Sequence, residues 1–463
     1  MIIVKIPNNF LSEKIYIIST LFDEFLGLNY QIETYSENDY KIVLDNKKEL
    51  IIKDSFFSNF KNQDYLSIQN MPQSPLQKTN NQFDFNKNLP IIYGKNTLEI
   101  SDNKIVCGVD IFASCFFMLT RWEEYVIKER DKYDRFLAKN SLAYKENFLD
   151  RPMVNEYTEM LWNMLKSLDI NQNRKKRKFT VCLAHDVDEI KRYKWYPPLG
   201  AIKRDVKNHN FKKATNIILD FIKTKLYLKK DPYHTALLDY IIDLEKKYGF
   251  KSSFYFMSSG EMYSLNNHWL QKFIKKLIIN NFEIGIHPSF NAYNNPNIIK
   301  RGKEKLEKII GGKVAGGRQH FLKWETPKSW ETWQKTGLKY DTTLCYADYE
   351  GFRCGTCYPF KPFNVIKRET INIWEIPLIV MDATLIDYRK LSPEKAIKTI
   401  ISLLNQIKKY NGVFVFLWHN SYMTDLFTPK WKKCFEDFYK IISKENCLVS
   451  SIEKVLINPW KNK

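Results

Sequence analysis

The stretch 179-FTVCLAHDVDEI-190 changes abruptly from an apolar run to His185, Asp186, Val187 and Asp188. The apolar residues 179–184 are typical of a buried β-strand. Asp186 and Asp188 are two positions apart, so a strand that continues locally places both carboxylates on the same face. We therefore expect this strand to end in a pocket and to bring two acidic groups to it.

After residue 178 the chain alternates apolar strands with amphipathic helices. Strands are expected at 179–184, 251–257, 282–287, 313–318, 371–382 and 412–418, and helices at 234–249, 268–281 and 393–411. This alternation predicts an α/β region with βα units around a parallel sheet, either open or closed into a barrel. A lysine-containing insertion, roughly 191–232, separates the first strand from the next helix.

The first part of the chain has a different pattern. It combines a helix expected at 12–27, β-rich runs at 40–44, 49–54, 90–94 and 97–101, a loop at 70–90, and later helical spacing. Because 463 residues exceed what one core usually supports, we expect two domains. The predicted boundaries are 1–172 for a smaller α/β domain of unassigned role and 178–455 for the second. The basic run 174–178 between them is interpreted as a solvated linker, with a binding patch as the alternative.

Composition narrows the class of protein. An apolar fraction of 44% with 15% aromatic residues is that of a globular protein. The first 25 residues lack the pattern of a secretory signal, and no apolar run reaches the length of a membrane span, so we expect a cytoplasmic location.

Eight cysteines are too sparse for a disulfide scaffold. The pair Cys354 and Cys357 has the spacing of half a zinc site or a redox pair, with two plain thiols as the alternative.

The formal net charge of +20 admits nucleic acid, anionic lipid or an acidic glycan as a partner. The basic residues are expected to be spread over the chain, and no nucleic-acid-binding motif accompanies them. We therefore expect no nucleic-acid partner.

Histidine placement points to chemistry at the strand ends. Four of the seven histidines follow an expected strand or lie in a glycine-flanked turn, namely His185, His287, His320 and His419. The carboxyl ends of parallel strands meet on one face, so these residues can share a pocket with the two aspartates. Such a set suits a divalent ion together with an acid and a base, although Asp and His also cap helices and finish loops.

Two further residues fit the same pocket. Arg318 in "GGRQHFLKW" can orient a carboxylate, and Asp382 at the end of the strand expected at 371–382 can support the imidazole of His419.

The order of these motifs over about 178–455 resembles the polysaccharide deacetylase family, the NodB-homology group also called carbohydrate esterase family 4. The resemblance implies that Asp186 is the catalytic base, that Asp188 and His287 bind the metal, and that Asn291 stands where the family has a second histidine. Since asparagine is a poorer zinc ligand than imidazole, Asn291, His185, His320 or water would complete the set, or the metal is weakly held or missing.

The remaining motifs carry further implied roles. By resemblance, Arg318 pairs with Asp186, and Leu417-Trp418-His419 supplies His419 as the general acid, supported by Asp382. Arg353 in 351-GFRCGT-356 and His320 are assigned to substrate binding, and a structural salt bridge is the alternative for Arg353. The resemblance also implies a distorted (β/α) barrel, usually of seven strands.

The implied function is a metal-dependent hydrolase that acts on C–N bonds other than peptide bonds and removes N-acetyl groups from an amino sugar. The cofactor would be a divalent ion, with zinc as the first choice, and the partner a carbohydrate connected with surface polysaccharides. Two alternatives stay open: a metal-independent C–N hydrolase on the same fold, and a non-catalytic glycan-binding protein.

Overall fold

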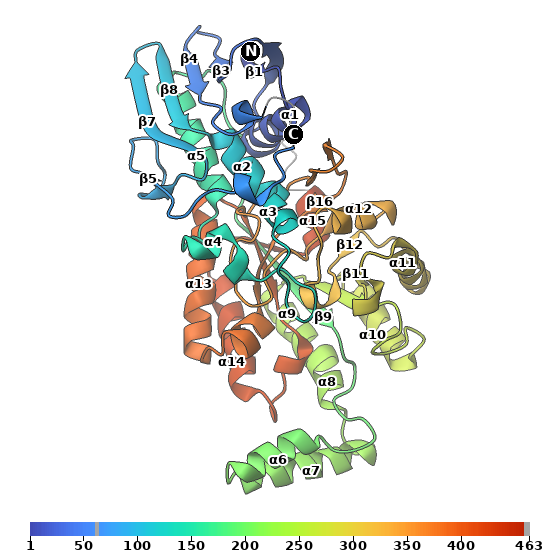
Figure 1. Cartoon of the computed structure of the whole chain (residues 1–463). Coiled ribbons are helices and arrows are strands. Elements are labelled where there is room, and N and C mark those ends of the chain that lie inside the picture. The colour runs from blue at the N-terminus through green and yellow to red at the C-terminus, as the bar shows by residue number, and fades with distance from the viewer. Residues whose placement is uncertain (61–63, 458–463) are drawn as a thin grey trace.

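The computed structural model describes residues 1–60 and 64–457, and Figure 1 shows two sheet-containing regions one above the other. The N-terminal sheet is mixed, with β1 parallel to β2 and antiparallel to β3. Its order is β2 (Tyr30–Tyr35), β1 (Ile2–Pro7), β3 (Tyr40–Val43), β4 (Glu49–Ile52), β8 (Lys104–Val109) and β7 (Gly94–Ser101). The prediction of a continuous strand at 90–94 is wrong, because β6 (Leu89–Pro90), paired with β5 (Lys78–Thr79), ends at Pro90 and β7 begins only at Gly94.

Helices cover this sheet as the apolar spacing predicts. The helix expected at 12–27 is α1 (Leu11–Ser19) followed by a π-helical turn, Thr20–Leu26, and it ends at Gly27 with φ of 69°. Every residue of α2 (Ile111–Thr120) is buried, and α2 contacts both α1 and α5 (Met153–Ser167). The carboxylate of Asp110 caps α2 by accepting from the Ala113 amide, 3.0 Å away.

The second region is built on a parallel sheet, as predicted. Its path is β16 (Trp374–Glu375), β13 (Tyr340–Asp341), β12 (Gly316–Gly317), β11 (Glu283–His287), β10 (Ser253–Met257), β9 (Thr180–Val187), β18 (Val413–Leu417) and β17 (Leu378–Met381). A last strand, β19 (Leu448–Ser450), pairs with the first residues of β9, below the point where β10 begins to pair. All eight residues of β9 are buried.

The two edge strands of this sheet, β16 and β17, are consecutive in the chain. β16 pairs with β13 and β17 pairs with β18, yet only Ile376 and Pro377 separate β16 from β17. The sheet therefore closes on itself as a distorted barrel, with seven strands when β16 and β17 count as one. Pro377 has no amide hydrogen for the ladder, which explains why the strand expected at 371–382 is interrupted.

The strand expected at 313–318 is reduced to Gly316 and Gly317. A Cβ on Gly317 would lie 1.8 Å from the carbonyl oxygen of Ile286 on the neighbouring strand, so this position accepts only glycine. The close approach brings the following residues, Arg318 to His320, against the end of β11.

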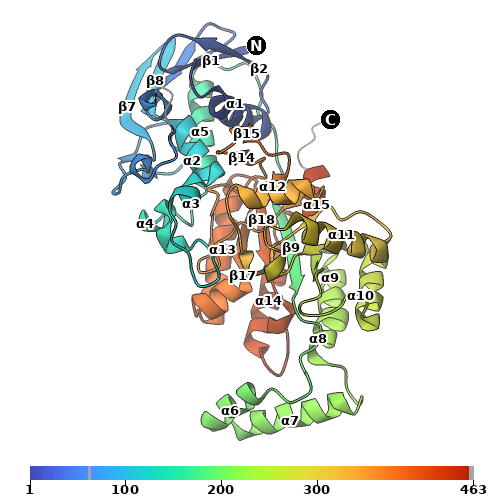
Figure 2. The same ribbon diagram turned by 45° about the vertical axis from the view of Figure 1, so that its right-hand side comes forward.

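Helices surround the barrel (Figures 1 and 2). They are α9 (Ile242–Tyr248), α10 (His268–Ile279), α11 (Pro296–Ile310), α12 (Lys328–Lys335), α13 (Pro393–Lys409) and α14 (Pro429–Ile442). The helices expected at 268–281 and 393–411 are confirmed as α10 and α13. In α13 the buried residues 396, 400, 403, 404 and 407 repeat with the period of an amphipathic helix.

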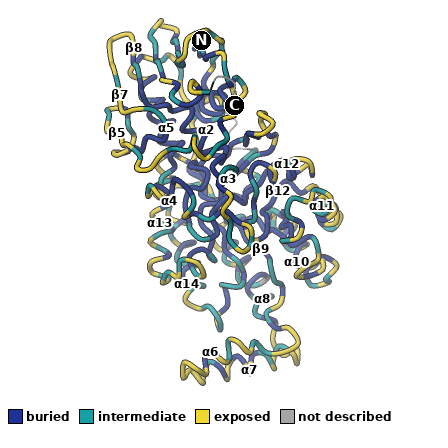
Figure 3. Tube along the Cα trace, viewed as in Figure 1, coloured by how far each residue is buried: buried dark blue, intermediate teal, exposed yellow. Residues whose placement is uncertain are grey.

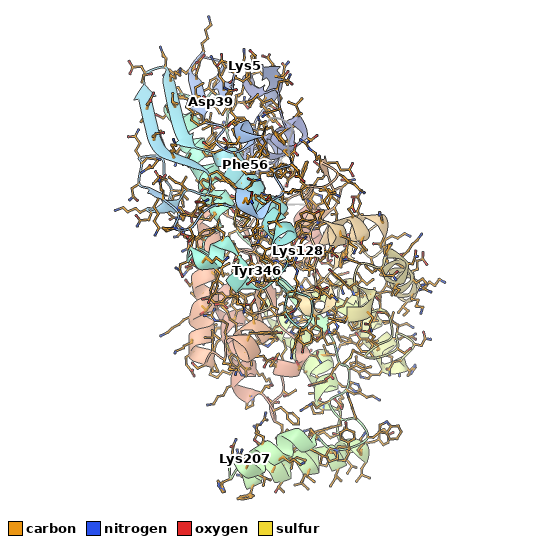
Figure 4. All side chains as sticks on the ribbon, in the orientation of Figure 1. Lys5, Asp39, Phe56, Lys128, Lys207 and Tyr346 are labelled. Atoms are coloured by element: carbon orange, nitrogen blue, oxygen red, sulfur yellow. The ribbon has the colours of Figure 1, made fainter. Side chains whose placement is uncertain are left out.

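The insertion after β9 forms two helices, α6 (Leu199–Lys207) and α7 (Phe211–Lys225), which stand away from the barrel in both views (Figures 1 and 2). Lys207, labelled in Figure 4, lies on this projection, and Figure 3 shows much of its surface as exposed. Residues 191–230 contain twelve Lys or Arg and two Asp. The expectation of evenly spread basic residues is therefore wrong.

A buried ion cluster joins the N-terminal region to the barrel. Glu124, in α3 (Trp122–Val126), accepts from Arg353 Nε at 2.9 Å and Nη2 at 2.7 Å, and also from Arg121 Nε at 2.9 Å. Arg121 in turn pairs with Glu123 and donates to Tyr346, which Figure 4 places where the two regions meet. Burial alone raises the pKa of Glu124, but Arg353 and Arg121 together lower it to about 2.

Several other expectations concern this junction. The predicted boundary between 172 and 178 lies between α5 and β9. The basic run there forms no helix or strand, and Arg174, Lys176 and Lys178 are exposed, as expected of a solvated linker. Two of its arginines also contact the N-terminal region: Arg174 pairs with Glu159, and Arg177 donates to the carbonyl of Glu24. All eight cysteines are free thiols, and burial raises the pKa of both Cys354 and Cys357, which favours two plain core thiols.

No helix among the described residues is long and apolar enough to span a membrane.

We expect Glu124→Gln to lower the free energy of unfolding by about 3 kcal/mol, because it leaves the buried Arg353 without a counter-charge. The matched control is Asp437→Asn, which breaks the exposed Lys433–Asp437 pair and should cost under about 1 kcal/mol. The midpoint of thermal unfolding checks both. Equal midpoints for the two variants would contradict a stabilising role for the cluster.

Candidate metal and catalytic site

The end of β9 positions two carboxylates on one side of the strand and a histidine on the other. Asp186 is 2% exposed, and the Asp188 side chain is 29% exposed. Their neighbour His185 faces away: its Nδ1 donates to the carbonyl of Trp418 at 2.8 Å and its Nε2 lies 3.1 Å from Glu245 Oε1. His185 therefore lies outside the pocket, as the alternation of a strand requires.

Asp188, His287 and His320 form a cluster that can hold a metal ion. Each offers one ligand atom, and these atoms lie within 4.8 Å of one another. Asp188 Oδ1 is 3.1 Å from His287 Nε2 and 3.8 Å from His320 Nε2.

The chemistry of these atoms fits a cation. Asp188 Oδ1 and His287 Nε2 are both buried, and apart from their mutual contact at 3.1 Å neither has a hydrogen-bond partner in the described part of the chain. Buried polar atoms without partners are rare unless they serve a ligand or an ion. One carboxylate and two imidazoles are also a donor set that suits zinc.

The imidazoles of His287 and His320 differ in their hydrogen bonds and in their pKa values. His287 Nδ1 donates to the carbonyl of Arg318 at 2.6 Å, which turns Nε2 towards the cluster. Burial lowers the pKa of His287, but Asp186 and Asp188 outweigh it and raise that pKa. Burial lowers the pKa of His320 to about 4, so this ring is neutral at pH 7. For Asp188, burial alone raises the pKa, and the three neighbouring histidines bring it well below its usual range.

A buried ion pair orients Asp186. Arg318 is fully buried, and its Nη1 donates to Asp186 Oδ1 at 2.7 Å while its Nε donates to the carbonyl of Thr342 at 2.9 Å. The second carboxylate oxygen, Asp186 Oδ2, lies 3.8 Å from His287 Nε2. One oxygen is thus held by the arginine and the other faces the metal cluster.

His419 completes the pocket from the end of β18. Its Nδ1 donates to Asp382 Oδ1 at 2.6 Å, and its backbone amide donates to the other oxygen of the same carboxylate. Its Nε2 lies 3.6 Å from Asp188 Oδ2. Burial lowers the pKa of His419, but Asp382 and then the two aspartates of β9 raise it to about 10.

Two residues assigned to the site lie elsewhere. Asn291 is exposed, and its side-chain amide donates to Glu261, so the structure gives the third metal position to His320 and not to Asn291. Arg353 is buried in the pair with Glu124 described above, and the alternative, a structural salt bridge, is the correct one. The sequence motifs around Asn291 and Arg353 do not indicate which side chains these two loop residues contact in the folded protein.

The pocket also has a rim residue that no sequence signal marked. Arg135, from the N-terminal region, donates from Nη1 to the carbonyl of Phe321 at 3.1 Å and from Nη2 to Tyr388 at 2.8 Å. Arg135 and Phe321 are 186 positions apart. Phe321 has φ of 63°, a strained value for a bulky residue, and it directly follows His320. The rim contact thus holds the turn that presents His320.

We expect the protein to bind one zinc ion per chain. The substitutions His287→Ala and His320→Ala should each weaken zinc binding by more than about 100-fold, which exceeds the loss usually seen when a residue that only hydrogen-bonds to a metal ligand is removed. Asn291→Ala is the control and should bind as the wild type does. Affinity should also fall from pH 7.5 to 5.5, since a proton on His287, whose pKa is raised, competes with the ion. Titration calorimetry checks all three, and an Asn291→Ala loss equal to that of His320→Ala would contradict the ligand set.

Comparisons with known proteins separate the two regions. The model described as "Family of unknown function (DUF7033)" matches residues 2–170. No curated protein matches the chain.

Among solved structures, a candidate polysaccharide deacetylase from Mycobacterium smegmatis is 16% identical with a TM-score of 0.41, over 61% of this chain and 90% of that one. Puue allantoinase is 10% identical with a TM-score of 0.41, over 62% and 93%. A carbohydrate esterase family 4 pseudoenzyme from Bacillus anthracis is 12% identical with a TM-score of 0.30, over 60% and 66%. These likenesses are distant, and the barrel is defined by the pairing of its own strands.

Proposed function

We propose that the barrel hydrolyses an N-acetyl group on an amino sugar, with a divalent ion as cofactor. The observation that carries the proposal is the convergence of two oriented pairs, Arg318–Asp186 and Asp382–His419, on the cluster of Asp188, His287 and His320. A binding protein has no need for an acid and a base on either side of a metal-binding cluster.

Asp186 is suited to act as the base. Its carboxylate is oriented by Arg318 through one oxygen, and the other oxygen is directed at the metal cluster. A water molecule between that oxygen and the cluster can give its proton to Asp186 as it attacks the acetyl carbonyl.

His419 is suited to act as the acid. Because Nδ1 is bonded to Asp382, the proton available for transfer is on Nε2, which faces Asp188 across the pocket. The raised pKa keeps this imidazole protonated at neutral pH, so it can donate to the departing amine. Asp382 fixes the ring through two contacts, to Nδ1 and to the backbone amide.

Asp188, His287 and His320 would hold the ion. When bound, a divalent ion polarises the carbonyl and stabilises the developing negative charge on its oxygen, a contribution of several kcal/mol.

The substrate class comes from the motif resemblance, and the rim of the pocket is compatible with it. The ring centroid of Phe321 lies 5.1 Å from that of Tyr133 and 5.5 Å from that of Phe290, and the rings of Tyr133 and Phe290 are 6.5 Å apart. Phe321 is 39% exposed at this rim. These rings offer apolar surface beside polar groups, the combination that small-ligand sites commonly use.

We expect wild-type protein loaded with zinc to release acetate from N-acetylated oligosaccharides, and Asp186→Asn or His419→Ala to reduce kcat by at least about 100-fold. Asn291→Ala, exposed and outside the cluster, is the matched control and should retain activity. A coupled enzymatic assay for acetate checks this. Activity that persists in both catalytic variants would contradict the assignment, and activity without bound ion would favour the metal-independent hydrolase.

We expect Asp382→Asn to shift the alkaline limb of kcat/KM to lower pH by about one unit or more, because it removes the charge that contributes most to raising the pKa of His419. An acid must be protonated, so activity is lost as pH rises through its pKa, and a lower pKa moves that loss downward. A pH–rate profile checks the shift, with an NMR titration of His419 as an independent reading. If the alkaline limb of the kcat/KM profile did not move, the general acid would be a group other than His419.

A further inference from the structure

The hairpin of α6 and α7 carries an unusual share of the exposed apolar surface. Of the 24 large hydrophobic residues that are exposed in the described part of the chain, 11 lie between residues 195 and 228. Monomeric proteins rarely gather so many on one projection without a partner for it. Figure 3 shows the same projection separated from the buried core.

The exposed apolar residues of α7 and of its C-terminal cap lie on a single face. They are Phe211, Ile218, Leu219 and Ile222 in the helix and Leu226 at the cap, between 40% and 61% exposed. Their spacing of 7, 8, 11 and 15 positions from Phe211 places them on one side of a 3.6-residue helix. The buried residues, Ala214, Ile217 and Asp220, lie on the other side, where α7 contacts α6. We call the exposed set the apolar stripe.

Basic residues flank the apolar stripe. By helical spacing Lys212 and Lys223 lie along one edge of it and Lys225 along the other. The twelve Lys or Arg and two Asp of residues 191–230 make this segment account for half of the net charge of +20. Both aspartates are buried, and Asp220 is bound to Tyr193 and Lys229, so residues 191–230 expose no acidic side chain.

We propose that the α6–α7 hairpin docks on an anionic lipid bilayer surface, with the apolar stripe at the acyl boundary and its lysines on the headgroups. An amphipathic helix with an apolar face and a Lys-rich polar face is suited to this position. Clustered basic residues add attraction to anionic lipid that weakens with salt. Trp195 and Tyr227, each 95% exposed, are of the kind enriched at membrane interfaces.

Other occupants explain only part of this surface. Nucleic acid would use the lysines for its phosphates but gives no reason for five adjacent exposed apolar side chains. A second copy would cover the apolar stripe but would bring two strongly basic hairpins together. An anionic bilayer satisfies both the apolar and the basic character.

The hairpin is also connected to the site along the chain. Residues 189–195 run directly from Asp188 to the hairpin, and all of them except Arg192 line a cavity of about 600 Å³ together with Lys225 of α7 and Tyr263. Tyr263 donates to the carbonyl of Val187, between the two site aspartates. Docking would therefore hold the barrel with this cavity next to the lipid surface. The docking itself does not depend on the proposed function.

The test is co-sedimentation of the full chain with vesicles of phosphatidylcholine alone or with 30% phosphatidylglycerol. We expect binding to the anionic vesicles at least about tenfold stronger than to the neutral ones, and weakened in 0.5 M NaCl. The triple variant Ile218→Ser, Leu219→Ser, Ile222→Ser and the triple variant Lys212→Glu, Lys223→Glu, Lys225→Glu should each lose most of this binding.

Matched controls change the same residue types on other helices. Ile278→Ser with Ile279→Ser alters exposed apolar residues of α10, and Lys300→Glu, Lys305→Glu, Lys308→Glu alters exposed lysines of α11. Both should bind vesicles as the wild type does, and all four variants should keep the wild-type thermal midpoint. Equal binding to both vesicle types, or loss in the controls as large as in the hairpin variants, would overturn the proposal. So would a dimer by light scattering that the apolar-stripe variant abolishes, or tighter binding to duplex DNA than to anionic vesicles.

Discussion

Closure of the parallel sheet through one short segment is the constraint on which the rest of this structure depends. Residues 374–381 pair with β13 on one side and with β18 on the other, so every strand of the barrel ends at the same rim. Side chains that end β9, β11 and β18 therefore meet although they come from distant parts of the chain. The break at Pro377 is tolerated because each half of the segment needs a partner on only one side.

The strand-end side chains were also the part of the site that sequence could predict. Asp186, Asp188, His287 and His419 follow long apolar runs, and the direction of a parallel strand is enough to bring their side chains together. His320 and Asn291 were harder, because both lie in turns whose path depends on close packing. The approach of Gly317 to Ile286 and the positive φ of Phe321 direct His320 inward, while Asn291 meets Glu261 outside.

Charged residues in loops were the least predictable. Arg353 and Arg135 look alike in sequence, each in a polar turn, but one is buried against Glu124 and the other reaches the rim of the pocket. Arg135 also pairs with Asp131, four positions before it, but its contact with Phe321 and the contact of Arg353 with Glu124 both reach across to the other region of the fold. The basic insertion is different, because its excess of twelve Lys or Arg over two Asp is already present in residues 191–230 of the sequence. The fold adds that α6 and α7 pack on each other and carry this charge away from the barrel.

The cluster of Arg121, Glu124 and Arg353 also limits how the two regions of this protein can be separated or combined with other domains. A chain cut between 172 and 178 would leave the barrel with a buried guanidinium whose counter-charge has gone with the other fragment. The sheet order divides the molecule into two parts, but the electrostatics link them, because Glu124 of α3 in the N-terminal region supplies the counter-charge for Arg353 of the barrel. Grafting the barrel onto another partner would thus require that partner to supply a carboxylate at the same buried place.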